Sequence, residues 1–105
     1  MSYVRACALS VLQEDVPKKV ELNGVPVAIV RTEEGVFAIN DTCSHANVSL
    51  SEGEVEDCMI ECWLHGSSFD LRTGKPSGLP ATRPVAVYPV KIEGDDVLVS
   101  VNQEN

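Results

Sequence analysis

Four residues in the middle of the chain have side chains that bind transition metals, and they occur as two short pairs. Cys43 is followed by His45 in the first pair and Cys62 by His65 in the second, with 16 residues between His45 and Cys62. The chain contains no other histidine. Isolated cysteines and histidines are most often separate structural residues, and such residues would not be expected to pair twice in this way. We therefore interpret the four residues as one ligand set.

Two thiolates and two imidazoles suit a [2Fe–2S] cluster in which one iron takes two cysteines and the other takes two histidines. Each short loop would supply one ligand of each kind, so the two loops would hold the cluster from both sides. A tetrahedral Cys2His2 zinc site uses the same ligands and is the alternative. The Cys-x-His spacing of the first pair fits structural zinc poorly, because zinc pairs are usually separated by at least two residues.

The composition limits the kinds of partner and location. The chain has 105 residues, enough for one ordinary domain over residues 1–105, and a formal net charge of −8. Nucleic-acid binding is not expected for such an acidic chain, because it needs clustered lysine and arginine. No apolar run approaches the roughly 20 residues that span a membrane, and the N-terminal segment lacks the pattern of a signal peptide. We expect a cytoplasmic protein without membrane contact. The negative charge suits brief docking on positively charged partners, and solubility alone is the alternative explanation.

Two further cysteines, Cys7 and Cys58, stand apart from the candidate ligands. Neither has a histidine or a basic residue directly beside it in the sequence. Because the chain shows no secretory features, disulfides are not expected, and we predict two buried thiols without activated chemistry.

The rest of the chain predicts an all-β domain, because short β-branched runs alternate with turn signals and no stretch shows a sustained helical period. Asn23-Gly24 is a strong hairpin signal between two such runs. The expected strands cover residues 3–9, 18–22, 25–31, 36–40, 85–92 and 97–101, with a short turn or one-turn helix near 11–15.

The middle of the chain, residues 41–84, differs from this pattern. It holds the four candidate ligands and is rich in glycine, serine and proline. We interpret it as a smaller, loop-rich subdomain inserted between the hairpins and built around something other than a large apolar core. Four of the six residues from Glu52 to Asp57 are acidic, which predicts a solvated turn. Trp63 is expected to pack structurally, with shielding of the metal centre or partner docking as alternatives.

In these motifs and their flanks the chain resembles the bacterial Rieske [2Fe–2S] ferredoxins. The ligand pattern is met in full, the flanking segments 41–42, 50–53, 60–61 and 66–70 also match, and segment 74–80 resembles the proline loop that covers the cluster. The resemblance implies an antiparallel β-sandwich with an inserted cluster-binding subdomain and one [2Fe–2S] cluster. It assigns Cys43 and Cys62 to the inner iron and His45 and His65 to the outer iron.

Departures from the high-potential Rieske proteins of respiratory membranes indicate a different subgroup. Those proteins carry a disulfide between the two loops, where this chain has Val48 and Leu64, and a tyrosine where this chain has Phe69. Ser67 stays a candidate hydrogen-bond donor to a cysteine sulfur. Because fewer hydrogen bonds to sulfur stabilise the reduced cluster less, the resemblance predicts a potential toward the low end of the roughly −150 to +300 mV Rieske range.

The chain is expected to carry electrons and not to be an enzyme. A Rieske oxygenase needs a second iron with two further histidines, and the cluster uses both histidines that the chain has. No glycine motif for nicotinamide binding is present. The resemblance implies a low-potential ferredoxin that passes single electrons from a ferredoxin reductase to the terminal oxygenase of a multicomponent aromatic-ring hydroxylating dioxygenase. The alternative is a Rieske-like small subunit of nitrite reductase.

Overall fold

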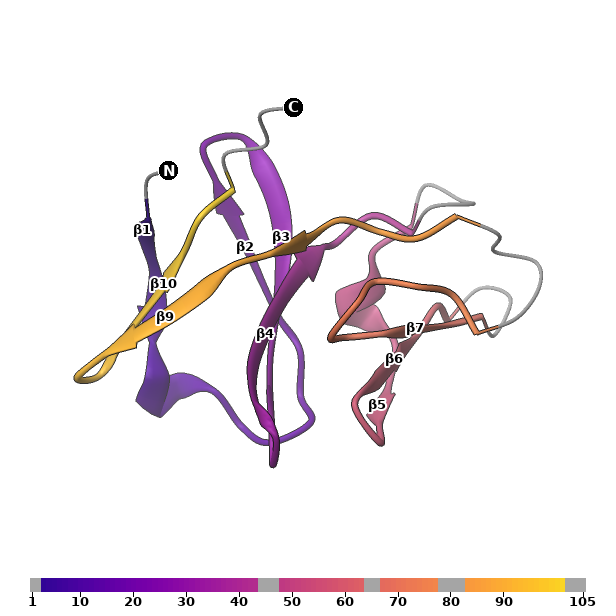
Figure 1. The fold of residues 1–105 in the computed structure, drawn as a ribbon, viewed down its shortest axis with the longest axis horizontal. Coiled ribbons are helices and arrows are strands. Elements are labelled where there is room, and N and C mark those ends of the chain that lie inside the picture. The colour runs from indigo at the N-terminus through magenta and orange to yellow at the C-terminus, as the bar shows by residue number, and fades with distance from the viewer. Residues whose placement is uncertain (1–2, 44–47, 64–66, 78–82, 102–105) are drawn as a thin grey trace.

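The computed structural model describes residues 3–43, 48–63, 67–77 and 83–101, which form three antiparallel sheets (Figure 1). The strand orders are β1-β10-β9, β2-β3-β4-β8 and β5-β6-β7. The strands are β1 (Val4–Ala8), β2 (Lys18–Leu22), β3 (Val25–Thr32), β4 (Gly35–Asn40), β5 (Val55–Glu56), β6 (Met59–Glu61), β7 (Ser68–Asp70), β8 (Val87–Tyr88), β9 (Val90–Glu93) and β10 (Asp96–Val99), with the 3-10 turns η1 (Leu9–Val11) and η2 (Leu50–Glu52). The predicted all-β class is confirmed.

Strand β3 lies between two hydrophobic cores. Its residues 27–30 have no exposed surface. Because side chains alternate along a strand, Val27 and Ile29 contribute to one core and Ala28 and Val30 to the other. The first core also contains Val97 and other residues of the β1-β10-β9 sheet, so the two larger sheets form the expected sandwich.

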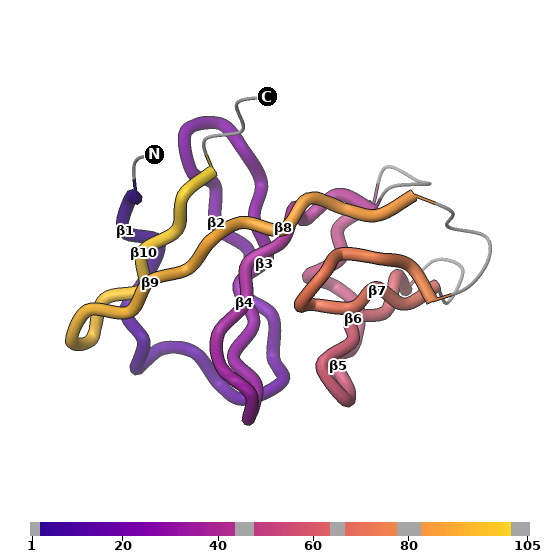
Figure 2. Tube along the Cα trace, viewed as in Figure 1, coloured from indigo at the N-terminus to yellow at the C-terminus, as the bar shows by residue number. Residues whose placement is uncertain are grey.

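The second core joins the sandwich to the small β5-β6-β7 sheet. It contains Leu50, Ile60, Phe69 and Leu71 together with the outer face of β3. The expectation that this part of the chain lacks a sizeable apolar core is therefore wrong. The chain leaves the sandwich after β4, forms the small sheet, and returns at β8 (Figure 2). That residues 1–105 form one domain with a subdomain near 41–84 stays a prediction.

The hairpin signal at Asn23-Gly24 is confirmed, since both residues have positive φ, +52° and +81°, between β2 and β3. The strand expected over residues 85–92 is instead divided at Pro89. Strand β8 pairs with β4, whereas β9 pairs with β10 in the other sheet, so this segment passes from one layer to the next. No helix in the described ranges is long and apolar enough to cross a membrane.

Candidate metal centre

Cys43 and Cys62 enter the same buried core from different sheets. Cys43 follows the end of β4 and is 3% exposed, whereas Cys62 directly follows β6 and is fully buried. Both belong to the core beneath the small sheet. The structure thus brings together the two cysteines that are 19 positions apart in the sequence. The other two predicted ligands, His45 and His65, lie outside the described residues.

The two loops that begin at these cysteines are closed in the same way. The Cys43 N–H donates to the carbonyl of Val48 at 3.0 Å, and the Cys62 N–H donates to the carbonyl of Ser67 at 2.6 Å. In each case the bond joins a cysteine to the residue five positions later. Just outside these bonds, Thr42 pairs with Ser49 and Glu61 pairs with Ser68 as antiparallel neighbours. Each loop is therefore the end of a hairpin, with its cysteine at the base.

The first loop is held by a buried carboxylate, that of Asp41. Its side chain is 1% exposed and accepts the Ser51 N–H at 2.8 Å, while Lys19 Nζ lies 3.7 Å from the other carboxylate oxygen. The Asp41 backbone carbonyl accepts the Leu50 N–H at 2.6 Å. Asp41 therefore fixes η2 against the end of β4, which sets the distance between the two ends of the first loop. Its role was not recognised from the sequence, where it appeared only as a flank of the motif.

The two loops are brought together by a close backbone approach at Gly53. A Cβ atom at this position would collide with the backbone carbonyl of Glu61, the residue before Cys62. A second approach occurs at Gly74, where a Cβ atom would meet the carbonyl of Val85. Only residues without a side chain allow these contacts, so both glycines are needed for the path of the chain around the site.

The surroundings of the cysteines fit an iron–sulfur cluster. Phe69 is fully buried in the core that contains both cysteines, Val48 packs against that core, and Ser67 is 2% exposed. Two thiol groups in a water-excluding apolar core, each at the base of its own closed loop, match the donor arrangement of a cluster held from both sides. Among the described side chains alone, no group of three possible metal ligands is present. The predicted ligand set includes the two histidines that lie outside the described residues.

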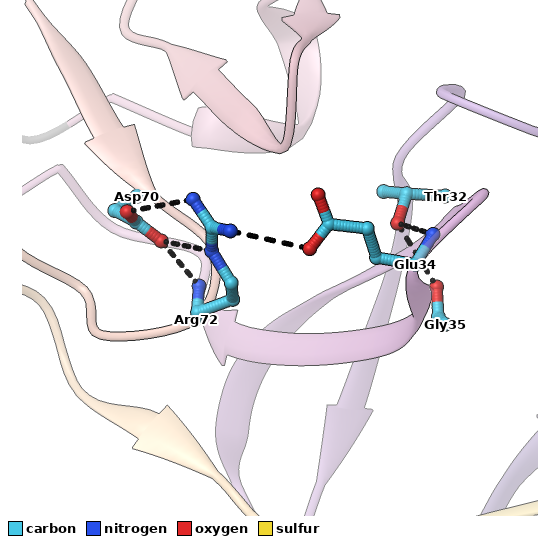
Figure 3. A network of polar contacts seen from close by, with 5 residues as sticks. All are labelled: Thr32, Glu34, Gly35, Asp70 and Arg72. Atoms are coloured by element: carbon cyan, nitrogen blue, oxygen red, sulfur yellow. Dashed lines mark hydrogen bonds and ion pairs between the residues drawn. The ribbon is translucent and has the colours of Figure 1, made fainter.

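The small sheet is also tied to the sandwich by a polar network (Figure 3). Arg72 Nη1 lies 3.2 Å from Glu34 Oε1, in the turn between β3 and β4, and Arg72 Nε donates to Asp70 Oδ1 at 3.1 Å. The Thr32 hydroxyl accepts the Glu34 N–H at 3.0 Å and donates to the carbonyl of Gly35 at 3.3 Å. This network lowers the pKa of Asp70, chiefly through its hydrogen bond from the Arg72 side chain.

Cys7 and Cys58 are buried thiols, as predicted, and form no disulfide. Burial raises the pKa of both thiols, so neither is activated as a nucleophile. The structure adds a basic neighbour that the sequence did not indicate, because Arg72 lies close enough to Cys58 to oppose this effect. Burial and the Glu34 carboxylate nevertheless dominate.

Trp63 differs from its expected packing, since 50% of its surface is exposed. It stands directly after the buried Cys62 and lies beside a groove whose other residues include Glu54 and Glu61. It is therefore a partly covered surface residue next to the candidate centre.

Comparison with known proteins agrees with this architecture. The sequence matches the family described as the Rieske [2Fe-2S] domain over residues 2–89. The chain belongs to this family. It is 40% identical over 102 residues to a "3-phenylpropionate/cinnamic acid dioxygenase ferredoxin subunit" of Shigella flexneri serotype 5b (strain 8401), covering 96% of this chain and 95% of that protein. As a family member it carries one [2Fe–2S] cluster.

Solved structures place the chain among the ferredoxins of the family. The ferredoxin of carbazole 1,9a-dioxygenase from Nocardioides aromaticivorans IC177 superposes with a TM-score of 0.91 at 38% identity, covering 95% of this chain and 98% of that one. A chain in a complex of reduced oxygenase and oxidized ferredoxin in carbazole 1,9a-dioxygenase superposes with a TM-score of 0.88 at 35% identity, covering 93% and 92%. The chain is thus a Rieske ferredoxin, an electron carrier and not itself an enzyme, as predicted.

Proposed function

We propose that this ferredoxin carries single electrons from a ferredoxin reductase to the terminal oxygenase of a multicomponent aromatic-ring dioxygenase. The observation that carries the proposal is the pair of identically closed loops that start at the buried Cys43 and Cys62. Its similarity to two dioxygenase ferredoxins supports the assignment of the partner class. A cytoplasmic location is part of the proposal, and cell fractionation tests it.

The ligands of the cluster in this proposal are Cys43, His45, Cys62 and His65. When bound, the cluster accepts and releases one electron at a time. The described residues provide two functions around it. The core beneath the small sheet excludes water from the two cysteine sulfurs, and the loop closures at Val48 and Ser67 fix where each cysteine lies. Fixed ligands need little rearrangement between oxidation states, which suits repeated electron transfer.

The test compares ligand cysteines with the two cysteines outside the set. The purified holoprotein should contain two irons and two labile sulfides, with the visible absorption of a Rieske centre. Cys43→Ser and Cys62→Ser should lose the cluster, as should His45→Ala, whereas Cys7→Ser and Cys58→Ser should keep it. A colourless protein with one bound zinc would refute the cluster, and an unchanged spectrum in His45→Ala would refute that ligand assignment.

The partner assignment is tested separately by electron transfer. Chemically reduced holoprotein is mixed with the oxygenase component encoded nearest to this chain, and with that of 3-phenylpropionate/cinnamic acid dioxygenase. Reoxidation of the ferredoxin at the rate of oxygenase reduction supports the proposal. A holoprotein with an intact cluster that reduces neither oxygenase would contradict it.

A further inference from the structure

Trp63 is the only tryptophan of the chain, and it is one of the most exposed large apolar side chains. It stands at the end of the molecule that carries the candidate centre, one residue after the fully buried Cys62. A half-exposed indole buries less apolar surface than an interior one, so its position is not explained by the stability of the core alone.

The indole lies in a groove of about 280 Å³ that is otherwise lined by Glu52, Gly53, Glu54 and Glu61. A second groove of similar size shares Glu54 and Glu61 with it and extends along the small sheet past Glu56 and Asp57. The two grooves therefore form one surface, which we call the Trp63 groove. It runs from the turn between β5 and β6 to the base of the second cluster loop.

The charges of this groove are not balanced by ion pairs among the described residues. None of its five carboxylates forms an ion pair with a lysine or arginine of the described chain, whose ion pairs involve other acids. Glu54, directly before β5, also lies opposite Glu61 at the end of β6, since the Glu61 N–H donates to the Glu54 carbonyl at 2.8 Å. Like charges in opposed positions destabilise a sheet, so this arrangement costs stability in the free protein.

A groove that holds an exposed indole and is lined by carboxylates is complementary to a positively charged side chain. A guanidinium or ammonium group can lie over the face of the indole and at the same time neutralise the carboxylates. Arginine fits best, because its planar group stacks on aromatic rings and forms paired hydrogen bonds with carboxylates. The distance from the groove to the cluster ligand is one residue along the chain, so a partner seated there would also contact the second loop.

We propose that the Trp63 groove is the docking site for the terminal oxygenase, which inserts an arginine or lysine side chain against Trp63. The proposal rests on the proposed function and specifies one flank of the small sheet as the contact surface. The oxygenase is chosen over the reductase because one of the matched structures is a complex between a ferredoxin and its oxygenase.

The proposal is tested with holoprotein variants and the same two oxygenase components. The variants are Trp63→Leu, Trp63→Phe and the triple change Glu52→Gln, Glu54→Gln and Glu61→Gln. Glu21→Gln is the control, because Glu21 is an exposed acid on β2 in the sandwich, outside both grooves. Binding is measured by calorimetry and electron transfer by stopped flow at two salt concentrations. The absorption spectrum and potential of each variant show that its cluster is intact.

We expect Trp63→Leu and the triple variant each to weaken oxygenase binding and slow electron transfer by about tenfold at low salt, with a smaller loss in Trp63→Phe. The triple variant should also lose most of its salt dependence, whereas Glu21→Gln should stay within about twofold of the wild type. If the wild type reduces the oxygenase but these variants bind and transfer as well as Glu21→Gln, the groove proposal is wrong and the proposed function stands. The same variants are also reduced with the ferredoxin reductase by stopped flow, and the groove is rejected as the oxygenase site if only this step is impaired. If the wild type with an intact cluster reduces neither oxygenase, the proposed function itself fails.

Discussion

The two loops that begin at Cys43 and Cys62 are closed by equivalent backbone hydrogen bonds but are supported in different ways. The Cys43 loop follows strand β4 of the sandwich, and the buried Asp41 carboxylate fixes the segment after the loop through its hydrogen bond from the Ser51 N–H. The Cys62 loop is the tip of a hairpin in the small sheet, supported by apolar residues such as Ile60 and Phe69. The same loop geometry is therefore obtained from a polar anchor on one side and from strand pairing over an apolar core on the other. The two supports meet at Gly53.

The largest effect is expected where the two supports meet. In Gly53→Ala the new methyl group would collide with the Glu61 carbonyl, and backbone cannot yield as a flexible side chain can. We expect a loss of about 3 kcal/mol in the free energy of unfolding, measured by denaturant titration, and poor retention of the cluster.

Gly24→Ala is the control for this variant. Gly24 has a positive φ but open space around it, so the substitution should cost only about 1 kcal/mol and leave the cluster spectrum unchanged. Equal losses in the two variants would show that backbone conformation, and not the contact between the loops, determines the effect.

Removal of the polar anchor should affect the first loop more than the second. Asp41→Ala leaves the Ser51 N–H without its acceptor in a partly buried position, and we expect about 2 kcal/mol of lost stability. Asp41→Asn keeps an oxygen acceptor and should lose less. Amide hydrogen exchange should increase first at Leu50 and Ser51, before the pairs of β6 and β7 open. If amide exchange accelerated equally at these two residues and in β6 and β7, the two loops would not have separate supports.

The sequence predicted the family and most strands of the sandwich, because these depend on residue type and local spacing. The set of four cluster ligands stays a prediction. The hairpin at Asn23-Gly24 is an example, since its turn chemistry is contained in two adjacent residues. It did not predict the anchor role of Asp41 or the contact at Gly53, because both depend on segments that meet only in the folded protein. The apolar core beneath the small sheet was missed for the same reason. Its members come from β3, β4, η2, β6 and β7 and from the segments that follow them, so no single segment indicates it.

The apolar support of the second loop allows a test of the predicted low potential. Phe69 lies in the core that contains both cysteines, and it is one of the positions at which the sequence departs from the high-potential Rieske proteins, which have a tyrosine there. Phe69→Tyr adds a hydroxyl that can donate to a cysteine sulfur and stabilise the reduced state. A hydrogen bond worth about 1 kcal/mol corresponds to roughly 40 mV for one electron, so we expect the midpoint potential to rise by about this amount.

Protein-film voltammetry measures this change, and the wild type should lie in the lower part of the Rieske range. Phe37→Tyr is the control, because Phe37 only packs against the edge of the same core. A wild-type potential above about +150 mV would contradict the low-potential assignment. No shift in Phe69→Tyr, with an intact cluster, would show that the hydroxyl does not reach a sulfur.

The smallest effect on stability is expected from loss of the polar contacts that join the small sheet to the sandwich. The first loop does not depend on these contacts. Arg72 joins Asp70 to Glu34 and lowers the pKa of Asp70 (Figure 3). A carboxyl whose pKa is lower in the folded state stabilises the protein above its ordinary pKa, and this contribution is lost as the pH falls through the folded value. Arg72→Gln should therefore lower the free energy of unfolding slightly at neutral pH, and the difference from the wild type should vanish in acid.

Arg5→Gln separates this tie from an ordinary surface ion pair. Arg5 lies 2.7 Å from Asp96 within one sheet of the sandwich, and both side chains are exposed. Both variants should change stability little, because exposed ion pairs contribute little. Only Arg72→Gln should accelerate amide exchange in β6 and β7, since Arg72, unlike Arg5, connects the small sheet to the turn between β3 and β4. If Arg72→Gln and Arg5→Gln gave the same exchange pattern, the ion pairs of Arg72 would not support the second loop. That loop would then depend on its apolar core alone, in contrast to the first loop with its polar anchor.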